Sequence, residues 1–297
     1  MKWRIILSSI FLIGLISIVY FFPSGRIDFV PSSGNTNFSI TNNSQMQFYS
    51  NLRFADTNIS YKISNCTLKK QNDMESAFKI IENITPLNFY PNLEGEIFIT
   101  CDEKIKPSEG GLFIAGEGGP TKIIGAGNFN IILEGKILLI KKSDCANPNV
   151  AIHELLHVLG FEHSSNPENV MYNITDCNQV IGDDVISLLN ELYLIPSYPD
   201  LVLEDVSASK HGTFVDVNFS IMNYGLKDSE NFMIQVYSSD SLLKEMEIEP
   251  IEIGKGRIIS VKNIFTIKQI DEIDVVIDST FEEINKENNK IKLEIKN

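Results

Sequence analysis

The chain has 297 residues, and its 39 acidic against 25 basic side chains give a formal net charge of −14. This acidic balance argues against a nucleic-acid partner and against binding to an anionic membrane surface, since both need a basic face. Four cysteines in a chain of this length are compatible with disulfide bonds in an extracytoplasmic protein.

The amino-terminal residues 1–22 predict a transmembrane anchor. Ile5 to Phe22 form an uncharged stretch of eighteen residues, long enough to span a bilayer. Lys2 and Arg4 precede it, which favours a cytoplasmic amino terminus with the rest of the chain outside. A cleaved signal peptide is the alternative, although residues 19–23 offer no small-residue cleavage site. We therefore expect a single-pass protein of the cell membrane or, alternatively, a secreted one.

Two segments of different character follow this stretch. Residues 23–53 are rich in Pro, Ser and Asn and predict a polar stalk. Residues 54–195 alternate strand and helix patterns, which predicts an α+β domain. The expected strands lie near 58–64, 95–101, 112–115 and 129–141, and the expected helices near 73–84, 149–160 and 181–193. Glu134-Gly135-Lys136 interrupts the apolar run at 130–140, which leaves a bend or a hairpin open there.

The cysteines lie in two pairs along this segment. Cys66 and Cys101 each follow or end a strand-like stretch, and a helical pattern separates the two stretches. A right-handed parallel pair would bring both cysteines to the same edge, which predicts a Cys66–Cys101 disulfide. Cys145 and Cys177 would then form the second bridge, although other pairings and free thiols stay open. No Cys-x-x-Cys spacing occurs, so metal binding by cysteine is not expected.

Residues 153–163 carry the strongest chemical signal of the chain. His153 and His157 are one helical turn apart, so their imidazoles leave the same face of a helix and can bind one metal ion. Gly160 follows where the helix would end in a sharp turn, which could bring His163 in as a third ligand. Three imidazoles with one open position are typical of a catalytic Zn²⁺ site, and Glu154 would lie beside that position.

The residues after the third histidine resemble those of the metzincin zinc peptidases. A polar loop leads to Val170-Met171-Tyr172, similar to the Met-turn beneath the metal in that superfamily. Ser164, directly after His163, resembles the matrixins, the matrix-metalloproteinase-like enzymes. The resemblance implies a metzincin-like catalytic domain, a twisted mixed sheet plus helices, over residues 54–195.

The resemblance also implies residue roles. His153, His157 and His163 would be the zinc ligands, Glu154 the general base and acid, and Met171 the floor of the site. Tyr172 follows the methionine directly, so it is expected to pack or to line a pocket. The chain also departs from the family, because it lacks a Pro-Arg-Cys-Gly latency segment and the proline-containing wall after the Met-turn. A cysteine-switch zymogen is therefore not expected, and substrate preference does not carry over.

The pattern changes after residue 195. Residues 196–200 predict a linker, and residues 201–297 contain seven short alternating stretches, which predicts an all-β immunoglobulin-like sandwich. The expected strands are Leu201–Val206, Thr213–Met222, Phe232–Tyr237, Leu242–Ile248, Arg257–Ile264, Ile273–Ile277 and Lys290–Ile295. Segments 221–225, 275–278 and 283–289 resemble the CARDB family of cell-surface adhesion modules. The sandwich is expected to be separable from catalysis, with truncation after Tyr198 retaining short-peptide hydrolysis.

These features predict an extracytoplasmic zinc metalloendopeptidase acting on protein or peptide substrates. One alternative is an adhesion protein that binds cell-surface polymers through the sandwich, with a zinc domain of minor activity. Another is a zinc hydrolase of non-protein or peptidoglycan-type substrates. Glu154 argues against a purely structural zinc domain, because such a domain has no physical need for a carboxylate at that position. The segment 116–120, Gly-Glu-Gly-Gly-Pro, is a candidate loop at the rim of the site.

Overall fold

The computed structural model of the chain describes residues 36–39, 45–103, 106–107, 113–140, 145–239, 241–266, 270 and 272–294. The expected apolar segment Ile5–Phe22 lies outside these residues, as does most of the expected stalk. Within the described ranges, no helix is both long enough and apolar enough to cross a membrane.

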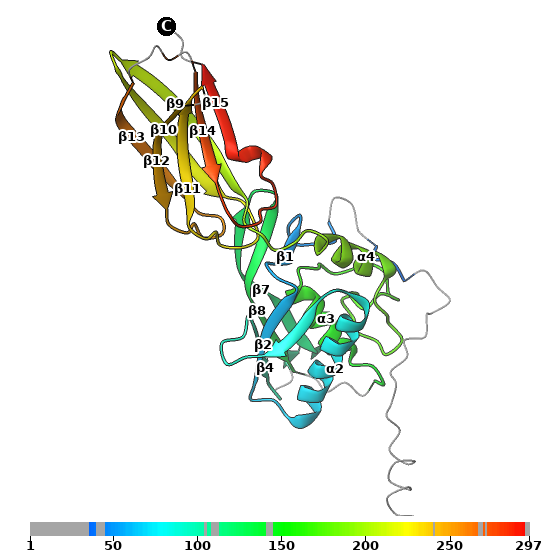
Figure 1. Cartoon of the computed structure of the whole chain (residues 1–297). Helices are drawn as coiled ribbons and strands as arrows, with labels where there is room; N and C mark the ends of the chain where they lie inside the picture. The colour runs from blue at the N-terminus through cyan, green and yellow to red at the C-terminus, as the bar shows by residue number, and fades with distance from the viewer. Residues whose placement is uncertain are drawn as a thin grey trace, which may run out of the picture. The chain divides into compact units, whose positions relative to one another are not determined.

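A mixed six-stranded sheet forms the first half of the fold (Figure 1). Its strand order is β1-β8-β4-β2-β3, all parallel, and β7 pairs antiparallel with β8 at the edge. The strands are β1 (Leu52–Phe54), β2 (Asn58–Ser64), β3 (Asn88–Pro91), β4 (Ile97–Cys101), β7 (Gly116–Ala126) and β8 (Phe129–Leu139). Two further short strands, β5 (Lys106–Pro107) and β6 (Phe113–Ile114), pair with each other.

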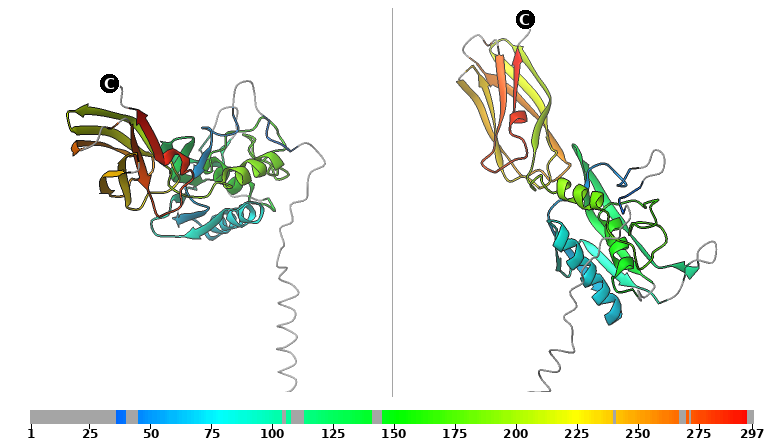
Figure 2. Two further views of the ribbon diagram at one scale, coloured as in Figure 1. Left: turned by 45° about the horizontal axis from the view of Figure 1, so that its top comes forward. Right: turned by 90° about the vertical axis from the view of Figure 1, so that its right-hand side faces the viewer.

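Helices cover one face of this sheet. Helix α2 (Leu68–Ile84) lies beside α3 (Asn149–Val158), and α4 (Asp183–Leu192) follows along the chain (Figures 1 and 2). Met74, Ala77, Phe78 and Ile81 of α2 are buried at the i, i+3, i+4, i+7 spacing of an amphipathic helix. All ten residues of α3 are buried, so the zinc motif lies on the central helix of the domain. The three expected helices are confirmed, although α2 begins at Leu68, five residues before its expected start.

The expected strands near 112–115 and 129–141 are confirmed as β6 and β8, but the expectation for residues 116–120 was wrong. β8 runs through Glu134-Gly135-Lys136 as one strand, which pairs with β1 in its first half and β4 in its second, and its pairing with β7 is irregular at Glu134. Gly135 lies against Val158 of α3, where the ideal Cβ position is 2.5 Å from the valine Cγ1. The segment 116–120 begins the eleven-residue strand β7 and is not a loop. Its glycines hid the strand pattern, since glycine is depleted in strands.

The end of the expected stalk packs on the first half of the fold. The Phe38 N–H donates to Asp184 Oδ2 at 2.7 Å, at the start of α4. The Phe48 N–H donates to the Gly160 carbonyl, and the Gln47 side chain bonds both the N–H and the carbonyl of Leu52. Residues 36–39 and 45–51 therefore contribute to the packed domain, which begins before the expected boundary at residue 54.

The Cys66–Cys101 disulfide is confirmed, with the two Cα atoms 4.9 Å apart. β2 and β4 are neighbouring parallel strands in which Ser64 lies opposite Thr100, so both chains leave the sheet at the same edge. The bridge therefore closes the loop that contains α2 and β3.

The carboxy-terminal third of the chain, from Leu201 to Glu294, is an all-β sandwich of two antiparallel sheets. One sheet has the order β13-β10-β9 and the other β12-β11-β14-β15. The strands are β9 (Leu201–His211), β10 (Phe214–Asn223), β11 (Phe232–Ser238), β12 (Ser241–Ile248), β13 (Gly256–Phe265), β14 (Glu272–Asp278) and β15 (Lys290–Glu294). Alternate side chains such as Val215, Val217, Phe219 and Ile221 fill the core between the sheets. The seven expected strands are confirmed.

The expected linker is hydrogen-bonded on both sides. The Ser197 hydroxyl donates to the Ala55 carbonyl, the Leu226 N–H to the Tyr198 carbonyl, and the Ile284 N–H to the Pro199 carbonyl. All described residues belong to one compact unit, Gly34–Asn297. Residues 196–200 are thus not a free hinge.

A second hydrophobic cluster joins the hairpin of β7 and β8 to the sandwich, and we call it the bridging cluster. Ala126, Ile131 and Leu226 are its buried members. Its partly buried members are Ala55, Ile124, Phe129, Leu133, Ile253 and Ile284. Truncation after Tyr198 would remove Leu226, Ile253 and Ile284 from this cluster, so the structure argues against the simple separability expected from the sequence.

Arg53 of β1 is a buried cation that ties the sheet to the end of α4. Its side chain is 1% exposed, and it donates to the carbonyls of Phe54, Leu192 and Ile195. Its guanidinium also lies over the Tyr193 ring, 4.1 Å from the ring centroid. The carbonyls at the end of a helix lack partners within the helix, so Arg53 satisfies acceptors that would otherwise be buried unpaired.

We predict that Arg53→Leu lowers the free energy of unfolding by about 2–4 kcal/mol, because several buried carbonyls lose their donor. Urea denaturation of the purified variant measures this change. Arg257→Leu is the matched control, since Arg257 is a solvent-exposed arginine of β13. An equal loss in both variants would contradict a special role for Arg53.

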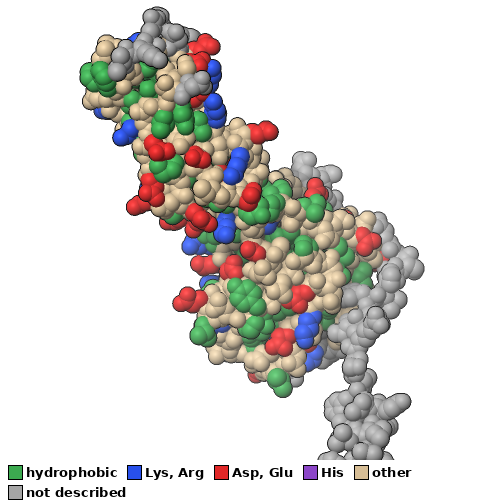
Figure 3. Space-filling view, in the orientation of Figure 1, with side chains coloured by type: hydrophobic (Ala, Val, Ile, Leu, Met, Phe, Trp, Pro, Cys, Tyr) green, Lys and Arg blue, Asp and Glu red, His purple; other side chains and the backbone are tan. Residues whose placement is uncertain are grey.

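The charged side chains are dispersed on the face that Figure 3 shows. Lys and Arg side chains alternate there with Asp and Glu side chains and do not gather into a basic patch.

Candidate metal centre

Three histidine side chains converge above α3. His153 Nε2 lies 3.0 Å from His157 Nε2 and 3.3 Å from His163 Nε2, and the last two are 3.1 Å apart. His153 and His157 leave the same face of α3 because they are four residues apart. Within the described residues these three form the one group of His, Cys, Asp or Glu side chains with metal-binding geometry.

The third histidine is brought in by the turn at the end of α3. Gly160 has φ +101°, a conformation that side chains strongly disfavour, and its ideal Cβ would be 2.8 Å from the Leu52 side chain. The Phe161 N–H donates to the Leu156 carbonyl, which closes the helix. The chain thereby reverses and places His163 opposite His153 and His157. The role that the sequence assigned to Gly160 is confirmed.

The other ring nitrogen of two histidines is fixed by backbone carbonyls. His153 Nδ1 donates to the Val170 carbonyl and His157 Nδ1 to the Phe161 carbonyl, both at 2.7 Å. With the proton on Nδ1, the Nε2 lone pair is free to bind a metal ion. Burial lowers the pKa of His153 to about 4 and that of His157 to about 3, so both imidazoles are neutral at pH 7.

These residues fit a zinc ion. Tetrahedral Zn²⁺ with N–Zn bonds of about 2.0–2.1 Å requires ligand nitrogens roughly 3.3 Å apart. The three Nε2 separations of 3.0–3.3 Å are close to that value. Three neutral nitrogen donors leave one position of a tetrahedral ion open, which is the arrangement of catalytic zinc.

Glu154 is a residue of α3, and its side chain lies against the edge strand β7. Its side chain is 5% exposed, and burial, followed by the charge of Glu117, raises its pKa to about 8. A bound cation would act against this rise, because it favours the carboxylate form. Gly116 allows β7 to lie close to the Glu154 side chain, because its ideal Cβ would be 2.6 Å from Glu154 Oε1. Gly118, two residues further along β7, allows a close approach to the backbone of Glu154, because its ideal Cβ would be 2.4 Å from the Glu154 carbonyl oxygen.

This contact gives a matched pair of substitutions. Gly118→Ala places a methyl group on the backbone of Glu154, so we expect β7 to move away from α3. The predicted loss is about 1–3 kcal/mol of stability, as for other overpacked sites, and at least about tenfold in kcat/KM because a displaced catalytic group loses its alignment. Gly119→Ala should change both little, because its ideal Cβ has no atom within 4 Å. Urea denaturation and peptide kinetics distinguish the two variants, and equal effects would contradict this packing.

The Met-turn loop holds the first ligand, His153, through a backbone carbonyl. Met171 is fully buried and follows Val170, whose carbonyl holds His153. The buried Asn169 side chain accepts from the Met171 N–H and donates to the Thr36 carbonyl. The Met171 carbonyl accepts from the N–H of Ser164, which directly follows His163. Backbone carbonyls of this loop therefore hold the His153 side chain directly and His163 through the next residue, Ser164.

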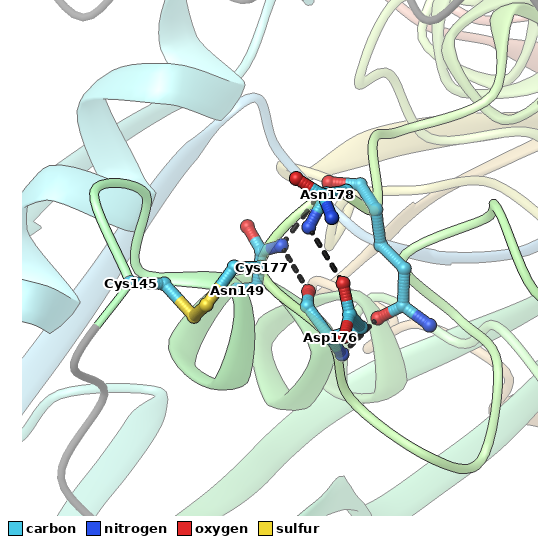
Figure 4. Close-up of a disulfide and its surroundings, with 6 residues drawn as sticks. Cys145, Asn149, Asp176, Cys177 and Asn178 are labelled. Carbon is cyan, nitrogen blue, oxygen red and sulfur yellow. Dashed lines mark hydrogen bonds between the residues drawn. A yellow bond between two sulfur atoms is a disulfide. The ribbon is translucent and has the colours of Figure 1, made fainter.

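The second disulfide, Cys145–Cys177, is confirmed and fastens this loop to the start of α3 (Figure 4). The Asn149 side chain, fully buried, donates to the carbonyls of Asp176 at 2.7 Å and Gln179 at 3.1 Å. The Gln179 side chain accepts from the Asp176 N–H and donates to the Ile174 carbonyl. The bridge and the two amides hold residues 174–179 as one rigid segment.

Several of these residues carried no sequence signal. Asn149, Asn169 and Gln179 act through long-range contacts to backbone groups, and Asn and Gln occur throughout the chain. Gly116 and Gly118 were assigned to a loop. His211 lies at the end of β9 and is exposed, and it is not part of the metal centre. Tyr172 is half-buried and forms a β-bridge with Ser164, as a packing residue would.

A cavity of about 560 Å³ lies against β4, β7 and β8. Phe98, Thr100, Lys136 and residues 117–121 are among those that line it. The three histidines and Glu154 are not among its lining residues.

The mixed sheet, the buried helix carrying His-Glu-x-x-His and the Met-turn define a metzincin-type zinc metallopeptidase domain. Comparison with protein-family models agrees, because residues 53–194 match the matrixin family and residues 198–293 match the CARDB family. The chain therefore consists of a matrixin domain followed by a CARDB domain.

Among solved structures, two of the CARDB domain of the PF1109 protein from Pyrococcus furiosus are similar to part of this chain. One is a crystal structure in complex with di-metal ions and the other a solution NMR structure. Each is 17% identical and covers 33% of this chain, with a TM-score of 0.28. The matches cover 88% and 94% of the two CARDB chains, respectively.

Proposed function

We propose that the protein is an extracytoplasmic zinc endopeptidase. The observation that carries the proposal is the convergence of His153, His157 and His163 beside the buried carboxyl group of Glu154. These histidines would hold the zinc ion. When bound, zinc polarises a carbonyl oxygen and lowers the pKa of water from about 15.7 towards 7.

Glu154 supplies the proton transfers. Its carboxylate accepts a proton from the water that attacks the scissile carbonyl, and it then delivers that proton to the leaving amine. The wall formed by β7 and α3 limits the access of bulk water to this carboxyl group, as its burial shows. Met171 and the Nδ1 hydrogen bonds of His153 and His157 hold the ligands in place.

The edge of β7 supports a polypeptide substrate. Among the described strands β7 pairs with β8 alone, so an extended peptide would add as a strand at its other side, beside Gly116 and Gly118. Gly116 and Gly118 of this edge contact Glu154, which places such a peptide beside the catalytic carboxyl group.

Disulfides and the amino-terminal sequence support a location outside the cytosol. Both disulfides lie in the matrixin domain, and disulfides persist mainly in oxidising compartments. The apolar segment Ile5–Phe22, preceded by Lys2 and Arg4, would anchor the chain in the cell membrane with both domains outside. Binding of the sandwich to cell-surface polymers is a further part of this proposal.

A peptide-library cleavage assay tests the function. The purified chain is incubated with zinc and a library of unstructured peptides, and the products are sequenced by mass spectrometry. We expect internal cleavage that a zinc chelator abolishes and that added zinc restores. Cleavage that is insensitive to chelation, or none in any peptide of the library, would contradict the proposal.

A further inference from the structure

The chain carries seven Asn-x-Ser/Thr sequons, the tripeptides at which an oligosaccharide is attached to asparagine outside the cytosol. They begin at Asn37, Asn42, Asn58, Asn65, Asn83, Asn173 and Asn218. Six of these asparagines lie within the described residues, and each of the six is exposed. The buried asparagines begin no sequon, and they are Asn149, Asn169, Asn223 and Asn289. Every described sequon therefore presents its acceptor side chain to solvent.

Local structure distinguishes Asn173 from the sequons that lie in helices and strands. Asn58 and Asn218 lie in β2 and β10, where their side-chain oxygens already accept hydrogen bonds. Asn83 lies in α2. Asn173 lies in neither a helix nor a strand, and the next residue, Ile174, is 46% exposed. An enzyme can therefore reach this tripeptide without opening a helix or a strand.

Asn173 also lies close to the metal centre. The Val170 carbonyl accepts from His153 Nδ1 at 2.7 Å, and Asn173 follows Val170 by three residues. Consecutive Cα atoms are about 3.8 Å apart, so the Cα atoms of Val170 and Asn173 are separated by at most about 11 Å. Tyr172 forms a β-bridge with Ser164, which follows the third histidine. A group attached to Asn173 is therefore near two of the three histidines.

The attachment point is held in place from both sides. The Asn169 side chain accepts from the Met171 N–H, which fixes the residues before Asn173. The Cys145–Cys177 disulfide and the buried Asn149 side chain hold the residues after it (Figure 4). A group on Asn173 therefore stays near the metal centre.

We propose that Asn173 carries an N-linked oligosaccharide, which limits the access of folded proteins to the metal centre and admits extended peptides. This inference rests on the extracytoplasmic location in the proposed function, because oligosaccharides are attached to sequons there. In the reaction, Asn173 Nδ2 forms a bond to the anomeric carbon of a lipid-phosphate-linked oligosaccharide. The bond between that carbon and the phosphate oxygen breaks, the phosphate leaves with the electron pair, and Nδ2 loses one proton.

The attached group defines a substrate class. N-linked oligosaccharides are bulky and hydrophilic, so one near the histidines blocks many of the orientations in which a folded protein approaches. A single extended chain is much narrower and needs less open space around the metal. The glycosylated enzyme therefore cleaves unfolded or terminal segments in preference to loops of folded proteins.

Mass spectrometry of the protein isolated from the cells that produce it naturally tests the modification. We expect the proteolytic fragment that contains Asn173 to carry the added mass of an oligosaccharide. Asn173→Gln and Thr175→Val, produced in the same cells, should both lose this mass, because each destroys the sequon. Asn178→Gln is the matched control, since Asn178 is an exposed asparagine of the same loop outside any sequon. An unmodified Asn173 in the wild-type protein would overturn the inference.

Kinetics on a folded protein and on a short peptide test the effect on access. Either sequon variant should raise kcat/KM for the folded protein at least about threefold, because fewer approach orientations are blocked. The short peptide should be cleaved at the wild-type rate, which also reports a folded catalytic domain. Thr175→Val keeps the asparagine, so a gain shared by both variants belongs to the oligosaccharide. If one variant fails to fold, the other decides, and an unchanged ratio of the two activities would overturn the inference.

Failure of the proposed function gives different results. A glycosylated protein that cleaves no peptide would contradict the peptidase function, whereas the result of mass spectrometry stands without any activity. Oligosaccharides on other sequons together with an unmodified Asn173 would support a location outside the cytosol and still overturn this inference.

Discussion

Glu154→Gln should abolish peptide hydrolysis while the protein keeps its zinc. Glutamine has nearly the shape of glutamate, but its amide cannot accept a proton from water. General acid–base catalysis contributes about 10²–10⁴-fold to rate, so we expect a loss of at least about a hundredfold in kcat. The three ligand nitrogens are unchanged, and their Nδ1 hydrogen bonds to Val170 and Phe161 do not involve Glu154.

Peptide kinetics and zinc content measured by atomic absorption check this expectation together. Glu168→Gln is the matched control, because Glu168 is an exposed carboxylate in the same zinc-binding segment. The control should keep wild-type turnover. A Glu154→Gln variant with more than a few per cent of wild-type turnover would falsify the role of the base, and loss of zinc would show that Glu154 supports the ligands instead.

The metal centre was predictable because its information is local. His153 and His157 lie one helical turn apart, and Gly160 marks the turn that brings in His163, so eleven consecutive residues determine the geometry. The sandwich strands were predictable for a similar reason, since the two-residue alternation depends only on which face of a sheet is buried. The Cys66–Cys101 disulfide followed from the assignment of two neighbouring parallel strands, and Cys145–Cys177 was the pairing of the two cysteines that remained.

The features that the sequence did not predict depend on contacts between segments that are distant along the chain. β7 has few side chains that mark a strand, and Gly116 and Gly118 are needed because α3 approaches closely. Arg53 is hydrophilic in sequence yet buried, because its guanidinium meets carbonyls about 140 positions later in the chain. The sequence predicted a linker at residues 196–200 because the residues that hydrogen-bond it, Ala55, Leu226 and Ile284, are distant along the chain. Local patterns carry no record of such partners.

Removing one disulfide should weaken zinc binding, whereas removing the other should not. Cys145–Cys177 encloses 32 positions and Cys66–Cys101 encloses 35, so the chain-entropy cost of losing either bridge is nearly equal. That cost is about 3–4 kcal/mol for loops of this length. We therefore expect a Cys145→Ser/Cys177→Ser variant and a Cys66→Ser/Cys101→Ser variant to lose similar stability in urea.

The two variants should differ at the metal. Cys177 belongs to the segment that Asn149 and Gln179 hold against α3, and the same loop carries Val170, whose carbonyl orients His153. Loss of an outer-shell partner of a metal ligand typically lowers metal affinity about 10–100-fold. We expect a loss of that order for the Cys145/Cys177 variant in competition with a chromogenic chelator. The Cys66/Cys101 bridge joins the carboxyl ends of β2 and β4 and includes no residue of α3 or the Met-turn loop, so its removal should leave zinc affinity unchanged in the protein that remains folded. Equal zinc affinities in the two variants would show that the second bridge stabilises the fold without positioning the metal centre.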